Sequence, residues 1–247
     1  MANQIPHGLF VTGTDTGVGK TQIAAALAHL LADRNLVVRP RKPVESGCQR
    51  RKGDRLMPED ARTLQVATRT DEPLAHICPY PMEPALSPER AAVLSGKTLT
   101  LDDVQAACLK GVADTDFLLV EGAGGFYSPL VSGALNVDLA VTLSLLVLLV
   151  AADRLGTIGH TLMAVEAIRR RGLTLAGVVL NRLSSHADPL MDNATDLFCW
   201  LGQPVIVTDR FDTGTVDPGW MMLRPALAAL ADRLATGLSV QSGLAVR

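Results

Sequence analysis

The sequence has no excess of positive charge. Lys and Arg total 23 and Asp and Glu total 25, so the 247 residues carry a formal net charge of −2. Proteins that bind nucleic acid neutralise its phosphates with an excess of Lys and Arg. The charge balance therefore argues against a nucleic-acid partner.

Closely spaced cysteines are also missing. No CxxC pair occurs, which argues against a zinc ribbon, a redox dithiol and a disulfide scaffold. The five histidines show no metal-ligand spacing, and no nucleophile-elbow motif suggests a Ser-His-Asp arrangement. We expect buried, reduced thiols at the four cysteines, which are Cys48, Cys78, Cys108 and Cys199.

Signals for export or membrane insertion are absent as well. The N-terminal stretch MANQIPHGLFVTG has no basic segment followed by an apolar core and a cleavage site. The only segment apolar enough to suggest a membrane span, residues 139–152, has 14 residues, whereas a helix needs roughly 20 to cross a bilayer. We interpret this run as the end of a helix that continues into a buried strand, and we expect a cytoplasmic protein.

The sequence does contain an α/β pattern. Hydrophobic residues make up 48% of the chain and charged residues 19%, which is enough apolar surface for a globular core. Almost continuously apolar runs alternate with amphipathic stretches, which predicts a central, mostly parallel sheet whose strands are covered on both faces. We predict a single α/β domain at residues 1–236 and a loose tail at 237–247. The predicted strands are residues 8–12, 37–44, 116–121, 146–151, 175–181 and 204–208.

Apolar side chains at helical spacing predict helices between these strands. One of them runs into three arginines at residues 169–171 and then Gly172, and cations followed by glycine are typical of a helix C-terminus. Thr100, with Asp103 three residues later, predicts the start of another helix. The predicted apolar faces span residues 23–31, 158–168 and 223–234.

Residues 73–88 break the alternation of strands and helices. They hold five of the 14 prolines of the chain, and proline does not fit a helix interior or a central strand. We predict a long ordered loop. Such a loop either lines a pocket or an interface, or is a plain surface excursion.

The first predicted strand leads into GTDTGVGKT at residues 13–21, and an amphipathic helix follows. Gly17 and Gly19 allow backbone N–H groups to wrap a β-phosphate, Lys20 offers positive charge to the β and γ oxygens, and Thr21 offers a hydroxyl to Mg²⁺. The spacing is one residue longer than in the strict GxxxxGK[ST] pattern. The context of strand, loop and helix nevertheless predicts a phosphate-binding loop and a three-layer fold of the P-loop NTPase type.

A carboxylate stands at the end of another predicted strand. The strand at residues 116–121 ends in Glu121, and the glycine-rich sequence GAGG follows it. In P-loop proteins the strand beside the loop carries an acidic residue that holds Mg²⁺ directly or through water. Glu121 fits that role, and the alternative is a strand that simply ends in a tight turn.

The sequence RKPVESG at residues 41–47 follows the second predicted strand. Ligands of open α/β sheets bind at the carboxyl ends of the strands, so we expect Lys42 and Ser46 to face the crevice of the phosphate loop. A lysine there would stabilise an anion that develops beside the γ-phosphate. Asp60 begins a predicted short helix and offers a second carboxylate to a metal. Glu59 is its rival, and either side chain also suits the first turn of a helix.

Five motifs together resemble one known family. GTDTGVGKT, KPVESG, PEDA, PYPMEPALSP and VEGAGG, in this order and at these intervals, are similar to those of the dethiobiotin synthetases, the ATP-dependent ring-closing enzymes of biotin biosynthesis. The resemblance covers roughly residues 8–208 and continues through LGTIGHTLMAVEAIRRRGLTLAGVVLNR. It implies the P-loop α/β fold and a homodimer that binds small-molecule substrate near the subunit interface.

The resemblance also implies roles for individual residues. Lys42 matches the catalytic lysine and Ser46 matches a substrate contact, while Lys20 assists in neutralising charge. The implied Mg²⁺ ligands are Thr21, Asp60 and Glu121. The implied contacts of the ATP co-substrate are Gly17, Val18, Gly19, Lys20, Thr21, Gln22, Asp60, Glu121, Gly122, Ala123, Gly124 and Asn181, the last of which matches the residue that reads the adenine edge.

The implied reaction starts from 7,8-diaminononanoate and CO2, which form a carbamate on one amine. The carbamate oxygen attacks the γ-phosphate of MgATP, and the second amine then closes the ureido ring, which releases phosphate and leaves ADP. Phosphoryl transfer depends mainly on positioning and charge neutralisation. Lys20, Lys42 and Mg²⁺ would supply both.

Two departures from the family pattern leave finer questions open. Gly159 stands where the family commonly has Asn near the substrate, although helix N–H groups near Thr157 would also suit a carboxylate. The sequence VTDRFD at residues 207–212 replaces an Ile-Pro turn against the nucleotide base. Substrate-carboxylate contacts and base selectivity therefore stay open.

Two alternative functions keep the same fold. Related amide-forming P-loop ligases usually add a glutaminase domain, for which we expect no room in 247 residues. Partner-regulated switch ATPases of the partitioning or maturation type carry an extra lysine early in the phosphate loop. This chain has Thr14 and Asp15 there, which favours the synthetase.

Overall fold

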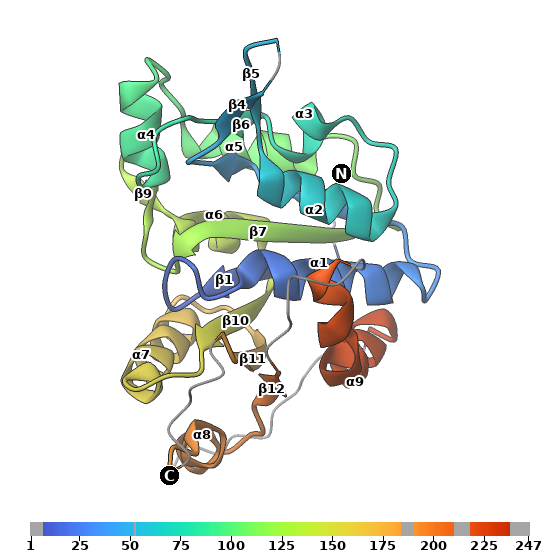
Figure 1. Cartoon of the computed structure of the whole chain (residues 1–247), viewed down its shortest axis with the longest axis vertical. Helices are drawn as coiled ribbons and strands as arrows, with labels where there is room; N and C mark the ends of the chain where they lie inside the picture. Colours follow the sequence, from blue (N-terminus) through green and yellow to red (C-terminus); the bar gives the residue numbers. More distant parts are fainter. Residues whose placement is uncertain (1–6, 52, 184–189, 210–217, 238–247) are drawn as a thin grey trace.

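The computed structural model describes residues 7–51, 53–183, 190–209 and 218–237. At its centre lies a six-stranded parallel sheet with the order β12–β11–β10–β1–β7–β2 (Figure 1), which confirms the predicted parallel sheet. The strands are β1 (Gly8–Gly13), β2 (Val38–Arg41), β7 (Phe117–Gly125), β10 (Leu146–Ala152), β11 (Leu175–Asn181) and β12 (Ile206–Thr208).

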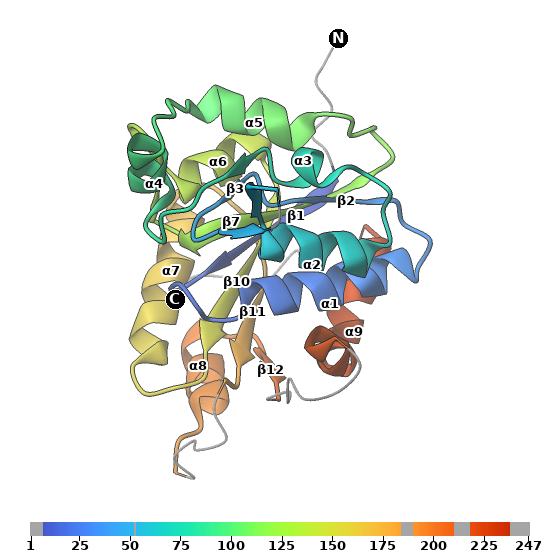
Figure 2. The same cartoon turned by 45° about the horizontal axis from the view of Figure 1, so that its top comes forward.

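Helices cover both faces of this sheet, which makes three layers (Figures 1 and 2). One face carries α1 (Lys20–Ala32), α2 (Glu59–Thr68), the short 3-10 helix η1 (Gly219–Leu223) and α9 (Arg224–Ala235). The other face carries α4 (Pro88–Leu94), α5 (Leu101–Leu109), α6 (Asn136–Leu143), α7 (Thr157–Arg170) and α8 (Asn193–Leu201).

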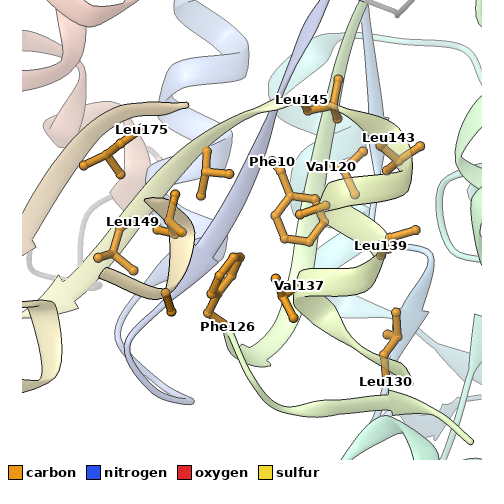
Figure 3. Packing of buried hydrophobic residues seen from close by; sticks show 14 of the residues in the cluster. Phe10, Val120, Phe126, Leu130, Val137, Leu139, Leu143, Leu145, Leu149 and Leu175 are labelled. Atoms are coloured by element: carbon orange, nitrogen blue, oxygen red, sulfur yellow. The ribbon is translucent and has the colours of Figure 1, made fainter. Parts of the chain in front are cut away.

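The sheet separates two hydrophobic cores. Successive residues of a strand point to opposite faces, and on β1 Leu9 and Val11 belong to one core while Phe10 belongs to the other. Figure 3 shows Phe10 beside Val120 of β7 in the second core. This double burial explains why the strands are apolar at nearly every position.

The predicted helix signals are confirmed. Thr100 accepts a hydrogen bond from the N–H of Asp103 and forms a capping box that starts α5. Gly172 follows α7 with a φ of 72°. The apolar run at residues 139–152 divides into the end of α6 and the strand β10. No helix in the described part of the chain has both the length and the apolar character that a bilayer span requires.

The predicted strand at residues 37–44 is wrong in its length. It divides into β2 and β3 (Val44–Glu45), because Pro43 has no N–H to donate to a ladder. The predicted strand at 116–121 is too short, because β7 continues through the glycines to Gly125. The expectation for Cys199 is also wrong. Its thiol is exposed, whereas the other three cysteines are buried.

The proline-rich region is only partly a loop. It contains α3 (Leu74–Ile77) and β6 (Tyr80–Pro81), and β6 pairs with β3. The N–H groups of Tyr80 and Met82 donate to the carbonyls of Pro43 and Glu45. Pro81 lies between these two donors, so the pairing needs no N–H from it.

Two small hairpins complete the described structure. They are β4 (Gln49–Arg51) with β5 (Arg55–Met57), and β8 (Pro129–Val131) with β9 (Ala134–Leu135). Residues 238–247 of the predicted C-terminal tail lie outside the described residues.

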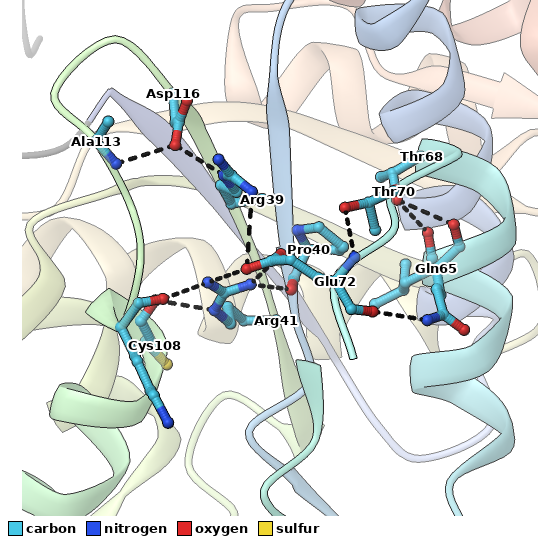
Figure 4. A network of polar contacts seen from close by, with 12 residues as sticks. Arg39, Pro40, Arg41, Gln65, Thr68, Thr70, Glu72, Cys108, Ala113 and Asp116 are labelled. Carbon is cyan, nitrogen blue, oxygen red and sulfur yellow. Dashed lines mark hydrogen bonds and ion pairs between the residues drawn. The ribbon is translucent and has the colours of Figure 1, made fainter. Parts of the chain in front are cut away.

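A buried ion network joins β2 to its surroundings (Figure 4). Arg41 is 0% exposed and pairs with Glu72 at 2.9 Å. Its remaining N–H groups donate to the carbonyls of Pro40, Cys108 and Lys110. The guanidinium thereby ties the strand to the end of α5 and to the segment after α2.

Candidate active site

The phosphate-binding loop connects β1 to α1 and depends on glycine at two positions. Gly17 and Gly19 have φ values of 75° and 91°, a region that side chains with a Cβ rarely adopt. A Cβ on Gly19 would also lie 2.1 Å from Nδ2 of Asn181. The chain turns here so that Lys20 starts α1 and its N-terminal N–H groups face the end of the sheet.

A pocket of about 300 Å³ lies at this edge of the sheet. The phosphate loop, the segment after β2, the first turn of α2 and the end of β7 form its walls. This arrangement confirms that the predicted segments share one crevice at the carboxyl ends of the strands. The lining residues are Thr16, Gly17, Gly19, Lys20, Thr21, Gln22, Lys42, Glu45, Ser46, Asp60, Glu121, Ala123 and Gly124.

Opposite charges meet at the centre of the pocket. Nζ of Lys42 donates to Oε1 of Glu121 at 2.6 Å and lies 3.1 Å from Oδ2 of Asp60. The hydroxyl of Thr21 donates to the same Oε1 atom at 2.9 Å. Lys42 is 4% exposed and Glu121 1%. Three segments distant in sequence therefore place one ammonium group between two carboxylates beside the phosphate loop.

The two lysines of the pocket differ in their electrostatic surroundings. Burial and the neighbouring charge of Lys42 lower the pKa of Lys20 to about 8. Burial alone would lower the pKa of Lys42 too, but Glu121 and Asp60 together raise it above its ordinary value. Burial would raise the pKa of Asp60, and Lys42 lowers it. The two carboxylates therefore favour the cationic form of Lys42, whereas Lys20 lacks a counter-ion of comparable strength.

The donor atoms of the pocket suit a magnesium ion that arrives with phosphate. Oε2 of Glu121 is buried without a hydrogen-bond partner, and such an oxygen gains from a cation. Among the described residues, no group of three or more His, Cys, Asp or Glu side chains can hold a metal. Mg²⁺ characteristically takes one or two carboxylates together with substrate phosphates and water. Thr21, Asp60 and Glu121 are compatible with that pattern.

The structure separates Asp60 from its sequence rival. Glu59 pairs with Arg51 at 2.7 Å, and both side chains are more than half exposed. Asp60, the next residue on α2, lines the pocket. Only Asp60 of the two contacts the charged centre.

Three residues that the sequence predicts as nucleotide contacts do not line the pocket: Val18, Gly122 and Asn181. Val18 is buried, and Gly122 lies against Phe10 and Asn136. Asn181 is 0% exposed, donates to the carbonyl of Val18 at 3.0 Å and accepts from Thr208 at 2.9 Å. Its contact with the adenine edge therefore stays a prediction.

Two residues of the site carry no role in the sequence interpretation. Both carboxylate oxygens of Glu45 accept hydrogen bonds from the start of α2. The side chain of Asn136 bonds to both backbone polar groups of Ala123, at 2.8 Å and 3.0 Å, and so fixes the end of β7. Glu45 lies within KPVESG, so the motif was a usable signal. Nothing in the sequence marks Asn136.

A larger cavity of about 660 Å³ lies on the other side of the phosphate loop. The start of the loop, residues 126–129 after β7, and α7 form its walls. Met163 of α7 lines it and is 63% exposed. Gly159 lies on the same helix, and a Cβ there would meet no atom within 4 Å. Residues 210–212 of the VTDRFD segment lie outside the described residues.

Comparison with known proteins gives a consistent result. A family model described as AAA domain matches residues 7–208. The ATP-dependent dethiobiotin synthetase BioD of Anaeromyxobacter dehalogenans is 45% identical over 183 residues, which cover 74% of this chain and 80% of that protein. The synthetase BioD of Rhodopirellula baltica is 38% identical and covers 83% of this chain and 84% of its own length.

Solved structures support the fold alone. The septum site-determining protein MinD complexed with Mg-ADP from Pyrococcus horikoshii OT3 aligns with a TM-score of 0.52 at 16% sequence identity. The alignment covers 96% of this chain and 98% of MinD. This likeness agrees with the P-loop architecture of the sheet and carries no further information on activity.

Proposed function

Because the chain belongs to the ATP-dependent dethiobiotin synthetase family, we propose that the pocket around Lys42 is its active site. The chain is an ATP-dependent ligase of biotin biosynthesis. It forms dethiobiotin from 7,8-diaminononanoate, CO2 and ATP, with ADP and phosphate as the other products. The observation that carries the assignment of the site is the buried ammonium of Lys42 between Glu121 and Asp60, next to a phosphate-binding loop.

The reaction proceeds in three bond-forming steps. One amine of the substrate attacks CO2, loses a proton and becomes a carbamate. A carbamate oxygen attacks the γ-phosphorus and breaks its bond to the bridging oxygen, which gives a carbamic-phosphoric anhydride and ADP. The second amine attacks the carbonyl carbon of this anhydride, phosphate leaves, and the loss of a proton completes the ureido ring.

The residues of the pocket contribute charge and position. Lys20 and the N–H groups around Gly17 and Gly19 hold the β- and γ-phosphate oxygens. Lys42 offsets the repulsion between the carbamate anion and the γ-phosphate. Ser46 contacts the substrate. Thr21, Asp60 and Glu121 would hold Mg²⁺, which when bound supplies further positive charge to the phosphates.

The backbone of residues 122–124 and the side chain of Gln22 complete the nucleotide site. Ala123 and Gly124 line the pocket, and Asn136 holds this segment in place. We assign the adenine contact to Asn181, whose amide then exchanges its present partners. A cytoplasmic location stays a prediction of the sequence.

We also propose that the chain acts as a homodimer with the substrate near the subunit interface. Two exposed apolar side chains support this assignment: Leu155, two residues before α7, is 93% exposed, and Met163, in the middle of α7, is 63% exposed. Met163 also lines the larger cavity beside the phosphate loop. A second subunit placed there would enclose the substrate.

The partner-regulated switch ATPase is the alternative function. This chain shares its fold with MinD. However, Thr14 and Asp15 stand where switch ATPases have an early lysine in the phosphate loop. The two functions differ in what triggers ATP turnover. A switch ATPase responds to a protein or DNA partner, whereas the synthetase responds to a small diamine and CO2.

Phosphate release from MgATP tests the proposal. Wild-type protein should release phosphate only when 7,8-diaminononanoate and bicarbonate are both present, and mass spectrometry should detect dethiobiotin. The substitution Lys42→Met should lower kcat by about 10²–10³-fold, the usual effect of losing one electrostatic contact to a transition state. Retained ADP binding would show that the variant is folded. Phosphate release that ignores the diamine would contradict the proposal.

A further inference from the structure

The helix that carries Asp60 begins without a cap of its own. The first N–H groups of any α-helix lack partners inside the helix, and a polar side chain at the N-cap usually supplies one. The N-cap of α2 is Pro58, which makes no side-chain hydrogen bond there. The first turn of α2 therefore needs an acceptor from elsewhere in the chain.

Glu45 of β3 supplies this acceptor. Its Oε1 accepts from the N–H of Asp60 at 3.0 Å, and its Oε2 accepts from the N–H of Ala61 at 3.0 Å. Glu45 is 7% exposed. These bonds satisfy two of the N–H groups that the start of the helix leaves unpaired, while burial and the neighbouring charge of Asp60 raise the pKa of Glu45 to about 7.

The backbone of Glu45 is itself held in place. Its carbonyl accepts from the N–H of Met82 at 2.8 Å, within the pairing of β3 with β6. The thiol of Cys48 donates to the same carbonyl at 3.3 Å. The carboxylate therefore reaches α2 from a fixed strand rather than from a free surface.

One short segment thus carries both the ammonium of the site and the cap of α2. Lys42 precedes Glu45 by three residues, and Asp60 lies 3.1 Å from Nζ of Lys42. The backbone N–H of Asp60 is one of the two groups that Glu45 holds. A shift of the first turn of α2 would move the carboxylate of Asp60 away from Lys42 and Glu121.

We propose that Glu45 is a positioning residue, which caps α2 from β3 and thereby holds the carboxylate of Asp60 at the place where Mg²⁺ binds with the nucleotide. The inference rests on the proposed role of Asp60 as a metal ligand. In this proposal Glu45 acts through Asp60: it also lines the pocket, but both of its carboxyl oxygens accept from the backbone of α2.

Binding of ADP with and without Mg²⁺, measured by isothermal titration calorimetry, isolates this role from catalysis. Glu45→Ala should bind ADP without metal as wild type does, because the phosphate loop is untouched. The gain in ADP affinity on adding Mg²⁺ should fall by about tenfold, within the 10–100-fold range typical of outer residues that orient metal ligands. Glu45→Gln, which keeps one carbonyl acceptor, should lose less and also covers the case that Glu45→Ala does not fold.

Thr100→Ala provides a matched control. Thr100 caps α5 by accepting from the N–H of Asp103 at 3.2 Å, and neither residue lines the pocket. Losing this cap should lower the free energy of unfolding by about 1 kcal/mol, as loss of a helix cap usually does. The effect of Mg²⁺ on ADP affinity should stay at the wild-type value.

Asp60→Ala tests the metal role of Asp60 independently of the positioning role of Glu45. If Asp60→Ala removes the Mg²⁺ effect and Glu45→Ala does not change it, the positioning role is wrong while the metal role of Asp60 stands. If Asp60→Ala itself retains the full Mg²⁺ effect, the proposed metal site is wrong. In the double variant, Glu45→Ala should add no further loss to that of Asp60→Ala. A further loss would show that Glu45 acts directly, which overturns the proposal.

Discussion

Two neighbouring residues at the end of β2 build buried ion clusters of opposite kinds. Every N–H group of Arg41 has an acceptor in the closed cluster around Glu72. Lys42, the next residue, belongs to an open cluster in which Oε2 of Glu121 has no hydrogen-bond partner. Both cations are almost fully buried. Burial of charge therefore does not identify a functional site by itself.

The difference lies in what each cluster leaves available. The closed cluster also contains Arg39, which pairs with Asp116 at 2.8 Å and lies 3.8 Å from Glu72. Its protein groups satisfy one another, and neither of the cavities described above is lined by Arg41, Glu72 or Asp116. The open cluster forms part of a pocket wall and retains an unused carboxylate oxygen. We expect variants of the closed cluster to lose stability and variants of the open cluster to lose ligand binding.

Arg41→Met should give the largest effect on stability. Removing one partner of a buried ion pair leaves the other charge uncompensated, which lowers the free energy of unfolding by about 3–5 kcal/mol. Urea unfolding measures this loss. At a temperature where the variant is folded, its kcat should stay within about twofold of wild type. A loss of activity as large as that of Lys42→Met would contradict the distinction between the clusters.

Asp116→Asn should give a smaller, pH-dependent effect in the same network. Burial would raise the pKa of Asp116, but the N–H of Ala113 and Arg39 together hold it below its ordinary value. The folded state therefore favours the charged carboxylate. Its contribution is complete above the unfolded pKa of about 3.9 and disappears as the pH falls through the lower folded pKa.

Urea unfolding at several pH values tests this dependence. At pH 7 the wild type should be more stable than Asp116→Asn by about 1.5–3 kcal/mol, the range for hydrogen bonds to charged groups. The difference should shrink as the pH falls below about 4, near the unfolded pKa. A difference that stays constant down to pH 2 would mean that the charge of Asp116 contributes nothing.

Glu121→Gln should give the smallest change in the free protein. The amide keeps an acceptor for Thr21 and Lys42, and Asp60 remains as the counter-ion of Lys42. Burial raises the pKa of Glu121 even beside Lys42, so the folded state gains little from the charge that the amide removes. The metal-free stability should therefore change by less than about 1 kcal/mol, the net value of one hydrogen bond. The added stability from MgADP should fall by about 1.4 kcal/mol, which corresponds to tenfold weaker binding.

Thermal unfolding with ADP alone and with MgADP measures the effect of Glu121→Gln. ADP without metal should stabilise both proteins equally. If MgADP stabilises the variant as much as it stabilises the wild type, Glu121 is not a metal ligand. The lack of a hydrogen-bond partner at its Oε2 atom would then have no explanation.

The sequence predicts those parts of the fold that local patterns determine. β11 has the predicted bounds, residues 175–181, because both of its faces are buried and its apolar run is continuous. The phosphate loop and the capping box at Thr100 follow from residue types at fixed spacing. Lys42 and Glu121 meet because the carboxyl ends of parallel strands share one edge of the sheet, and Asp60 joins them from the first turn of α2.

Contacts between distant segments account for what the sequence does not predict. In the sequence Glu45 is recognisable only as part of KPVESG. Its capping role depends on the position of α2 against β3. Arg41 reads as one more cation beside Lys42, although its partner Glu72 lies 31 residues away. β7 continues through its glycines because β1 pairs with it as far as Gly125.

The alternation of Leu9 and Phe10 on β1 has a consequence for how the protein can evolve. Their side chains belong to hydrophobic cores on opposite faces of the sheet, and the two cores have no side chain in common. Effects of mutations at sites without shared neighbours usually add. Each layer of helices can therefore drift in sequence without compensation from the other, while the residues at the shared edge of the sheet remain under constraint from both.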